Sequence, residues 1–120
     1  MAWKGIYDEV SFVEPLRKRF AELNQALRRV QDRDAAADVL ASVEELRRFV
    51  DAIKHVDGPS ESLAPVPDGE NLFRLRVERW DAYFLFDLSA QAYYGMLVDH
   101  PDVPVVRRLD ELLPRLRSAT

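Results

Sequence analysis

The sequence contains no cysteine, which excludes a disulfide framework, a thiolate metal site and catalysis by a cysteine nucleophile. Its two histidines, His55 and His100, are too few for a histidine-rich zinc site. No apolar stretch approaches the roughly 20 residues that span a bilayer, and the first residues lack the apolar core of a secretory signal. We therefore expect a cytoplasmic protein that holds neither a metal nor another cofactor.

A basic excess, which phosphate binding requires, is also missing from most of the chain. Residues 1–31 carry six basic and four acidic groups, residues 32–71 carry four and ten, and residues 72–120 carry seven of each. This distribution argues against non-specific binding to DNA or RNA. What the sequence does have is a hydrophobic content of 48% over 120 residues, which is enough for one domain spanning residues 1–120.

The first half of the sequence has the periodicity of two amphipathic helices. Apolar residues recur at alternating spacings of three and four over residues 16–30 and again over residues 36–53. Asp32 or Asp34 is suited to cap the second helix. Because few polar residues separate the two apolar seams, they favour an antiparallel helical hairpin within one chain. The alternative is a coiled coil between two chains.

The second half has the two-residue period of strands. Residues 72–77 alternate, with Phe73, Leu75 and Val77 on one face, while residues 81–86 and 91–98 are nearly all apolar. Short connections predict an antiparallel meander, residues 3–7 can add an edge strand, and residues 105–116 have helical spacing. The predicted fold class is α+β, with an N-terminal helical hairpin packed on a small antiparallel sheet and a short C-terminal helix.

One hairpin of this pattern resembles a known family. The run Leu72-Phe73-Arg74-Leu75-Arg76-Val77, followed by Trp80, Tyr83 and Phe84, is similar to the central hairpin of the RelE/ParE toxin superfamily. Val98-Asp99-His100-Pro101 falls where the third strand of that family ends in a Gly-His-Arg-like motif, and the predicted element order agrees as well. The resemblance implies a toxin-type module that is silenced by an antitoxin-like partner. It acts on ribosome-bound mRNA in RelE-like members and on DNA gyrase in ParE-like members.

The resemblance also implies which residues bind phosphate or a partner. Arg74 and Arg76 match the two strand arginines, His100 matches the histidine at the end of the last strand, and Arg79 lies in the turn between the first two strands of the meander. In the cleaving branch such cations stabilise the negative charge that builds up when a 2′-hydroxyl attacks phosphorus.

Other family positions are replaced. Asp81 and Pro101 stand where the family has arginines, and no tyrosine follows Tyr94. Because a carboxylate repels phosphate, these replacements argue against nuclease activity. We therefore expect a module that acts by protein binding. The alternative is a non-catalytic interaction or regulatory protein on the same scaffold.

Each of these residues also has a structural interpretation. Arg74 and Arg76 can form the solvated face of a strand, paired with carboxylates across the sheet, and His100 can be a turn residue bonded to a neighbouring carboxylate. The aromatic residues of the second half are mostly core, with Trp80 in a turn as the first candidate for exposure. If the hairpin leaves apolar surface uncovered, Leu40, Phe49 and Trp80 are candidates for a partner groove.

Overall fold

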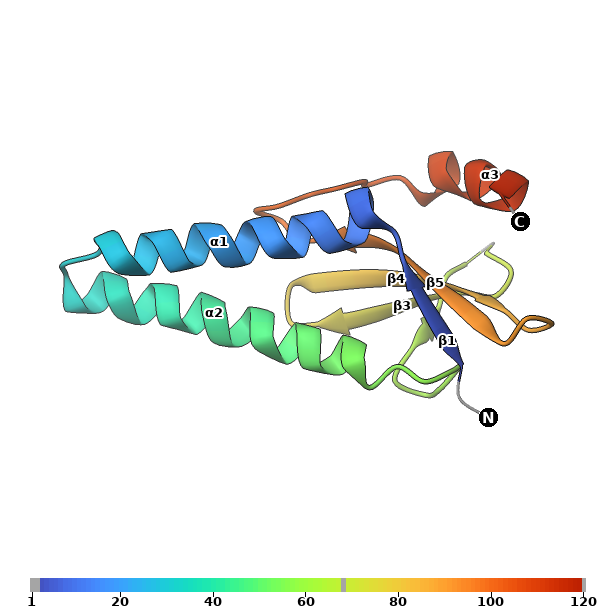
Figure 1. The fold of residues 1–120 in the computed structure, drawn as a ribbon, viewed down its shortest axis with the longest axis horizontal. Helices are drawn as coiled ribbons and strands as arrows, with labels where there is room; N and C mark the ends of the chain where they lie inside the picture. The colour runs from blue at the N-terminus through green and yellow to red at the C-terminus, as the bar shows by residue number, and fades with distance from the viewer. Residues whose placement is uncertain (1–2, 68, 120) are drawn as a thin grey trace.

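The computed structural model describes residues 3–67 and 69–119, and its elements follow the predicted order (Figure 1). The helices are α1 (Glu14–Arg29), preceded by one π-helical turn η1 (Glu9–Val13), then α2 (Arg33–Lys54) and α3 (Leu109–Ala119). The strands are β1 (Lys4–Tyr7), β2 (Ala64–Pro65), β3 (Leu72–Val77), β4 (Trp80–Asp87) and β5 (Ala92–Asp99). The α+β class, the helical hairpin and the meander are therefore confirmed.

The five strands form one sheet in the order β1-β5-β4-β3-β2. The meander β3-β4-β5 and the short β2 pair antiparallel, but β1 pairs parallel to β5, so the sheet is mixed and not wholly antiparallel as predicted. A parallel pair needs a long connection, and here the whole helical hairpin and most of the meander lie between the two strands. The short β2 was not predicted; it lies in the segment between α2 and β3.

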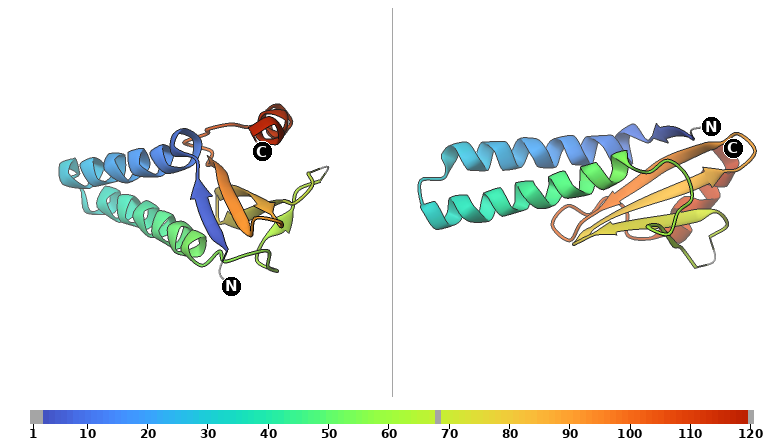
Figure 2. Two further views of the ribbon diagram at one scale, coloured as in Figure 1. Left: turned by 45° about the vertical axis from the view of Figure 1, so that its right-hand side comes forward. Right: turned by 90° about the horizontal axis from the view of Figure 1, so that it is seen from below.

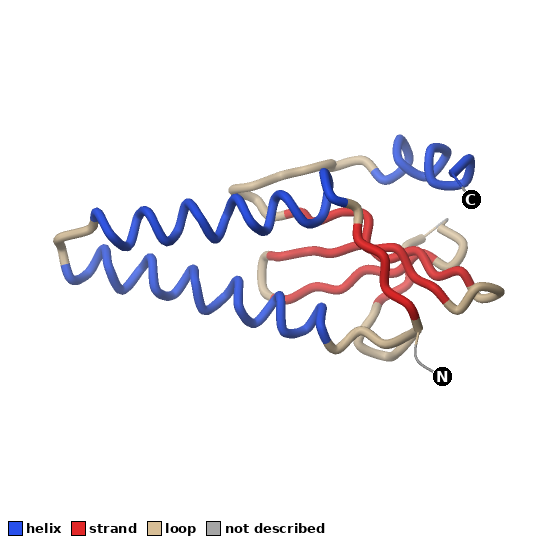
Figure 3. The backbone as a smooth tube through the Cα atoms, in the orientation of Figure 1, coloured by secondary structure: helices blue, strands red, loops and turns tan. Residues whose placement is uncertain are grey.

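The helical hairpin covers one face of the sheet and extends well beyond its end (Figures 1 and 3). As predicted, Asp32 caps α2: its carboxylate accepts a hydrogen bond of 3.0 Å from the Ala35 N–H. The turn η1 begins in the same way, with Asp8 accepting from the Ser11 N–H at 2.8 Å. None of the described helices is long and apolar enough to cross a membrane.

The core lies between this hairpin and the sheet. Phe73, Leu75 and Val77 share one face of β3, as their alternation predicts, and face Phe84, Ala82 and Trp80 of β4 in register. Phe49 and Trp80 stack at 5.2 Å between ring centroids, with 0% and 2% of their surface exposed. The prediction that these two residues line a partner groove is therefore wrong. Trp80 is not in the turn: it begins β4 on the side that faces the helices.

Gly95 allows β1 and η1 to pack closely on β5. A Cβ atom at this position would lie 2.5 Å from Cδ1 of Tyr7 and 3.1 Å from Cε2 of Phe12. The Tyr7 hydroxyl lies 3.0 Å from the hydroxyl of Tyr93, which donates in turn to the Val56 carbonyl at 2.8 Å. These contacts join the edge strand to the sheet and to the end of α2.

The C-terminal part of the chain passes to the other side of the sheet. After β5, an extended segment runs beside the first half of α1, and α3 then lies on the sheet face opposite the hairpin (Figure 2). The helix begins at Leu109, four residues later than predicted, and includes Pro114. Both faces of the sheet are thus partly covered. The end of β3, the start of β4 and the end of β5 lie together at one end of the sheet.

Candidate functional site

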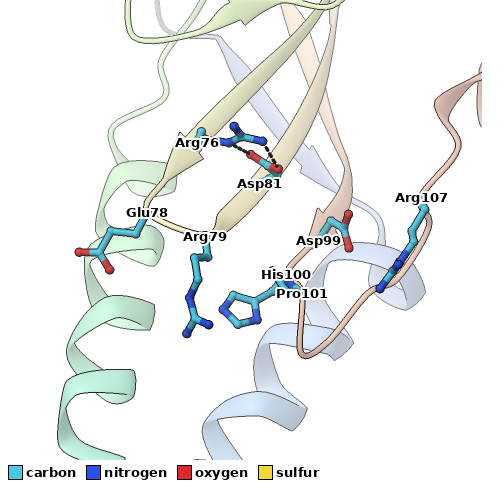
Figure 4. A pocket seen from close by; sticks show the side chains of 8 residues that line it. All are labelled: Arg76, Glu78, Arg79, Asp81, Asp99, His100, Pro101 and Arg107. Carbon is cyan, nitrogen blue, oxygen red and sulfur yellow. Dashed lines mark hydrogen bonds and ion pairs between the residues drawn. The ribbon is translucent and has the colours of Figure 1, made fainter. Parts of the chain in front are cut away.

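A cavity of about 520 Å³ opens at this end of the sheet, beside the β3–β4 turn and the end of β5 (Figure 4). Charged side chains dominate its wall. The lining residues are Arg76, Glu78, Arg79, Asp81, Asp99, His100, Pro101 and Arg107. The three adjacent strands β3, β4 and β5, the turn between β3 and β4 and the segment after β5 therefore bring together residues that lie far apart in the sequence.

Three of the four predicted site residues, Arg76, Arg79 and His100, line this cavity. Arg74 does not. It lies on the same strand face as Arg76 but two residues farther from the turn, about 6–7 Å along the strand. There it faces Tyr83 across β4 and borders a separate pocket near Leu109. The four candidates consequently do not form a single cationic cluster.

Arg76 is paired with the residue that replaces a family arginine. Asp81 lies directly opposite it in the β3–β4 register, and two hydrogen bonds join the side chains, from Nε at 2.8 Å and from Nη2 at 3.0 Å. The hydrogen bonds and charge of Asp81 raise the pKa of Arg76 above its ordinary value. In this bidentate geometry Asp81 occupies the edge of the guanidinium, Nε and Nη2, that would otherwise bind a phosphate.

Arg79 also faces carboxylates. The β3–β4 turn has only two residues, and Glu78 adopts a positive φ of 56° there, which directs Arg79 back toward α2. Its guanidinium donates to Glu45 at 3.3 Å and lies 3.8 Å from Asp102. The hydrogen bond to Glu45 is the main reason why the pKa of Arg79 is raised.

His100 is a buried residue at the end of β5, with 2% of its surface exposed. Its ring packs on Trp80 at 4.3 Å between centroids, and Nδ1 accepts a hydrogen bond of 3.1 Å from the Asp102 N–H. The neutral ring therefore carries its proton on Nε2, which faces Oε1 of Glu45 at 3.7 Å. Burial, and secondly the charge of Arg79, lowers the pKa of His100.

Glu45 is one of the site residues that the sequence did not indicate. It lies within α2, is 8% exposed, and extends toward both Arg79 and His100. The one available signal is its position one helical turn before Phe49, which belongs to the buried stripe. Asp99 is not among the predicted site residues. It lies opposite Asp81 on β5, and its Oδ1 is buried without a hydrogen-bond partner among the described residues.

Positive and negative charges balance in the cavity. The wall contributes three arginines and three carboxylates, and Glu45 and Asp102 approach from behind. Within residues 3–67 and 69–119, no group of three or more His, Asp or Glu side chains is arranged to hold a metal ion. The cavity therefore lacks the positive potential that concentrates phosphate.

No protein-family model and no curated protein matches the sequence. Among solved structures, the toxin–antitoxin complex RelBE2 from Mycobacterium tuberculosis contains a chain that is 14% identical, with a TM-score of 0.42 over 83% of this chain and 92% of that one. The isolated RelE toxin of E. coli is 9% identical, with a TM-score of 0.45 over 96% of this chain and 99% of that one. The chain is similar in fold to RelE toxins. What the cavity can bind depends on the residues of this chain that line it.

Proposed function

We propose that this chain is a RelE/ParE-like toxin-type module of a toxin–antitoxin-like pair that acts by binding protein and not by cleaving RNA. The resemblance of residues 72–84 to the central toxin hairpin supports the toxin type. The same resemblance supports an antitoxin-like partner in the cytoplasm, and a target on the ribosome or on DNA gyrase.

The ion pair between Arg76 and Asp81 is the observation that carries the binding mode. RNA cleavage by 2′-hydroxyl attack needs fixed cations at the phosphate, because negative charge increases in the transition state. Here Oδ1 of Asp81 lies 2.8 Å from Nε of Arg76, the cation that would have to bind the phosphate. A phosphate at Arg76 would therefore meet a carboxylate at nearly the same distance, and the repulsion would offset the attraction.

His100 is not placed to transfer a proton in this arrangement either. His100 is covered by Trp80, and its Nδ1 is occupied by the Asp102 N–H. A general acid or base must reach the reacting atom within about 3 Å or through one water molecule. Burial keeps the His100 ring from doing so, which supports a structural role for it between α2 and β5.

Growth of a bacterial culture after induction of the chain tests this proposal. We expect growth arrest while cellular mRNA stays intact, because the target is held by protein contacts. The double substitution Arg74→Ala with Arg76→Ala, compared with Arg28→Ala and Arg29→Ala on the far end of α1, tests whether the strand face takes part. Relief by the first pair alone would assign the action to that face.

Two results would overturn the proposal. Arrest accompanied by mRNA cleavage on the ribosome would make the chain a nuclease in spite of Asp81. Undisturbed growth in cells that contain the soluble chain would rule out a toxin. It would favour the alternative, a non-catalytic interaction or regulatory protein on the same scaffold. Altered DNA supercoiling during arrest would assign the target to gyrase, and stalled translation with intact mRNA would assign it to the ribosome.

A further inference from the structure

A second pocket, of about 350 Å³, lies beside the start of α3, on the sheet face opposite the hairpin (Figure 2). It is bounded by β2 and the residues that follow it, by β3 and β4, and by the first turn of α3. The lining residues are Pro65, Val66, Pro67, Arg74, Tyr83 and Leu109. None of them lines the charged cavity, so this Arg74 pocket is separate from it.

The fold holds the walls of the Arg74 pocket in place. Arg74 and Tyr83 lie directly opposite each other in the register of β3 and β4. The Val66 N–H donates a hydrogen bond of 2.9 Å to the Leu72 carbonyl, which fixes the segment after β2 beside β3. Prolines on both sides of Val66 restrict that segment further, because their φ angles are fixed. A preformed pocket of about 300–1,000 Å³ is typical of a small-molecule site.

The charge of the Arg74 pocket differs from that of the charged cavity, where the arginines contact carboxylates within 3.3 Å. Arg74 is half-buried, and in the part of the chain that the structure describes it is the one charged residue that lines its pocket. Asp110 and Glu111, in the first turn of α3, pair instead with Arg108 at 2.8 and 3.6 Å. A guanidinium in this setting favours an anionic ligand.

The remaining walls indicate the size and polarity of that ligand. Tyr83 contributes an aromatic face and a hydroxyl group. Burial, and secondly the charge of Asp81, raises the pKa of Tyr83, so its hydroxyl stays protonated and can donate a hydrogen bond. The other lining residues are apolar: Pro65, Val66, Pro67 and Leu109. Such walls suit a flat apolar body better than a heavily hydrated group.

We propose that the Arg74 pocket binds a small organic monocarboxylate with a flat apolar body. The carboxylate would accept two parallel hydrogen bonds from the Arg74 guanidinium and a third from the Tyr83 hydroxyl. The body of the ligand would lie between the prolines and Leu109. A phosphate monoester fits less well, because it carries close to a second negative charge, for which the described lining residues offer no cation.

Titration of the chain with three probes tests this proposal: benzoate, benzamide and phenyl phosphate. Benzamide has the shape of benzoate without its charge, and phenyl phosphate carries more charge on the same ring. In amide NMR spectra we expect benzoate to shift residues around the pocket, Val66 and Leu109 among them. The other two probes should each bind at least tenfold more weakly.

Substitutions on β3 and β4 test which groups hold the carboxylate. Arg74→Gln should weaken benzoate binding at least tenfold. Arg76→Gln, the same loss of charge two residues along the same strand, should leave it within about twofold. Tyr83→Phe should weaken it by about threefold to tenfold, the effect of one hydrogen bond. Circular dichroism of each variant establishes that the fold is retained.

Four results would overturn the proposal. Equal binding of benzoate and benzamide would show that the charge of Arg74 takes no part, and tighter binding of phenyl phosphate would make the pocket a phosphate site. Equal losses in Arg74→Gln and Arg76→Gln would place the ligand elsewhere. The absence of shifts at about 10 mM benzoate would show that the pocket does not take this ligand, because even an inefficient ligand of this size is half bound there.

Discussion

Arg76 and Asp81 face each other across β3 and β4, and this pairing determines the properties of the cavity. The alternation of the strand predicts which face Arg76 occupies. On that face Arg76 pairs with a carboxylate on the neighbouring strand, as its structural interpretation predicts. The contact between Glu45 and Arg79 could not be predicted in the same way. It joins α2 to a turn 34 residues later, and no local pattern encodes that distance.

At this scale, His100 should make the stability of the protein depend on pH. Its pKa is lowered in the folded state, mainly by burial, so the unfolded chain binds the proton more readily. The charged groups that face it are Glu45, Asp102, Arg79 and Arg19. Stability should be complete above the ordinary histidine pKa of 6.5 and should decrease as the pH falls below it.

Urea unfolding at pH 7.5 and at pH 5.5 measures this effect. The natural chain should lose stability between the two conditions, and the variant His100→Gln should lose distinctly less, because its side chain does not titrate. An equal loss in both chains would show that His100 is as easily protonated folded as unfolded, contrary to its burial against Trp80.

At the scale of the elements, one apolar seam joins the two helices of the hairpin, and its buried residues Leu23 and Val43 lie near the middle of α1 and α2. The spacing of apolar residues predicts both helices and the Asp32 cap correctly, because these features depend on neighbours within one or two turns. The same spacing does not distinguish Phe49 from Leu40. Which of them is buried depends on where the sheet ends beneath α2.

The two residues should therefore respond differently to truncation. Phe49→Ala removes a fully buried ring that stacks on Trp80 and should destabilise the fold by about 3–5 kcal/mol. Leu40→Ala, on the same helix, should change stability by less than about 1 kcal/mol, since 48% of the surface of Leu40 is already exposed. Chemical denaturation of both variants measures this difference, and similar losses would contradict the described packing of α2.

At the scale of the whole molecule, the order of elements could be predicted, but two pairings in the sheet could not. Alternation in residues 72–77 and the apolar runs that follow identify the meander. The parallel pairing of β1 with β5 depends instead on Gly95, where Tyr7 and Phe12 approach the strand. The two-residue β2 could not be predicted, because Pro65 and the residues around it are typical of a loop.

The complete arrangement separates two surfaces. The charged cavity lies beside the β3–β4 turn and the end of β5. There the predicted cations Arg76 and Arg79 each already have a carboxylate within 3.3 Å. An apolar groove of about 310 Å³ is lined by residues of β1, η1, the first half of α1 and the last turns of α2. Because Arg76 and Arg79 already pair with carboxylates, the surface at the charged cavity is poorly suited to bind phosphate.

The measurement that tests this account most directly is titration of a single-stranded RNA with the natural chain, Arg76→Ala and Asp81→Asn, near 0.15 M salt. We predict that the natural chain leaves the RNA intact and binds it no better than Arg76→Ala does. Asp81→Asn should bind more tightly than both, because Arg76 is then free to meet phosphate. Cleavage or tight binding of the RNA by the natural chain, lost in Arg76→Ala, would contradict the claim that Asp81 neutralises this site.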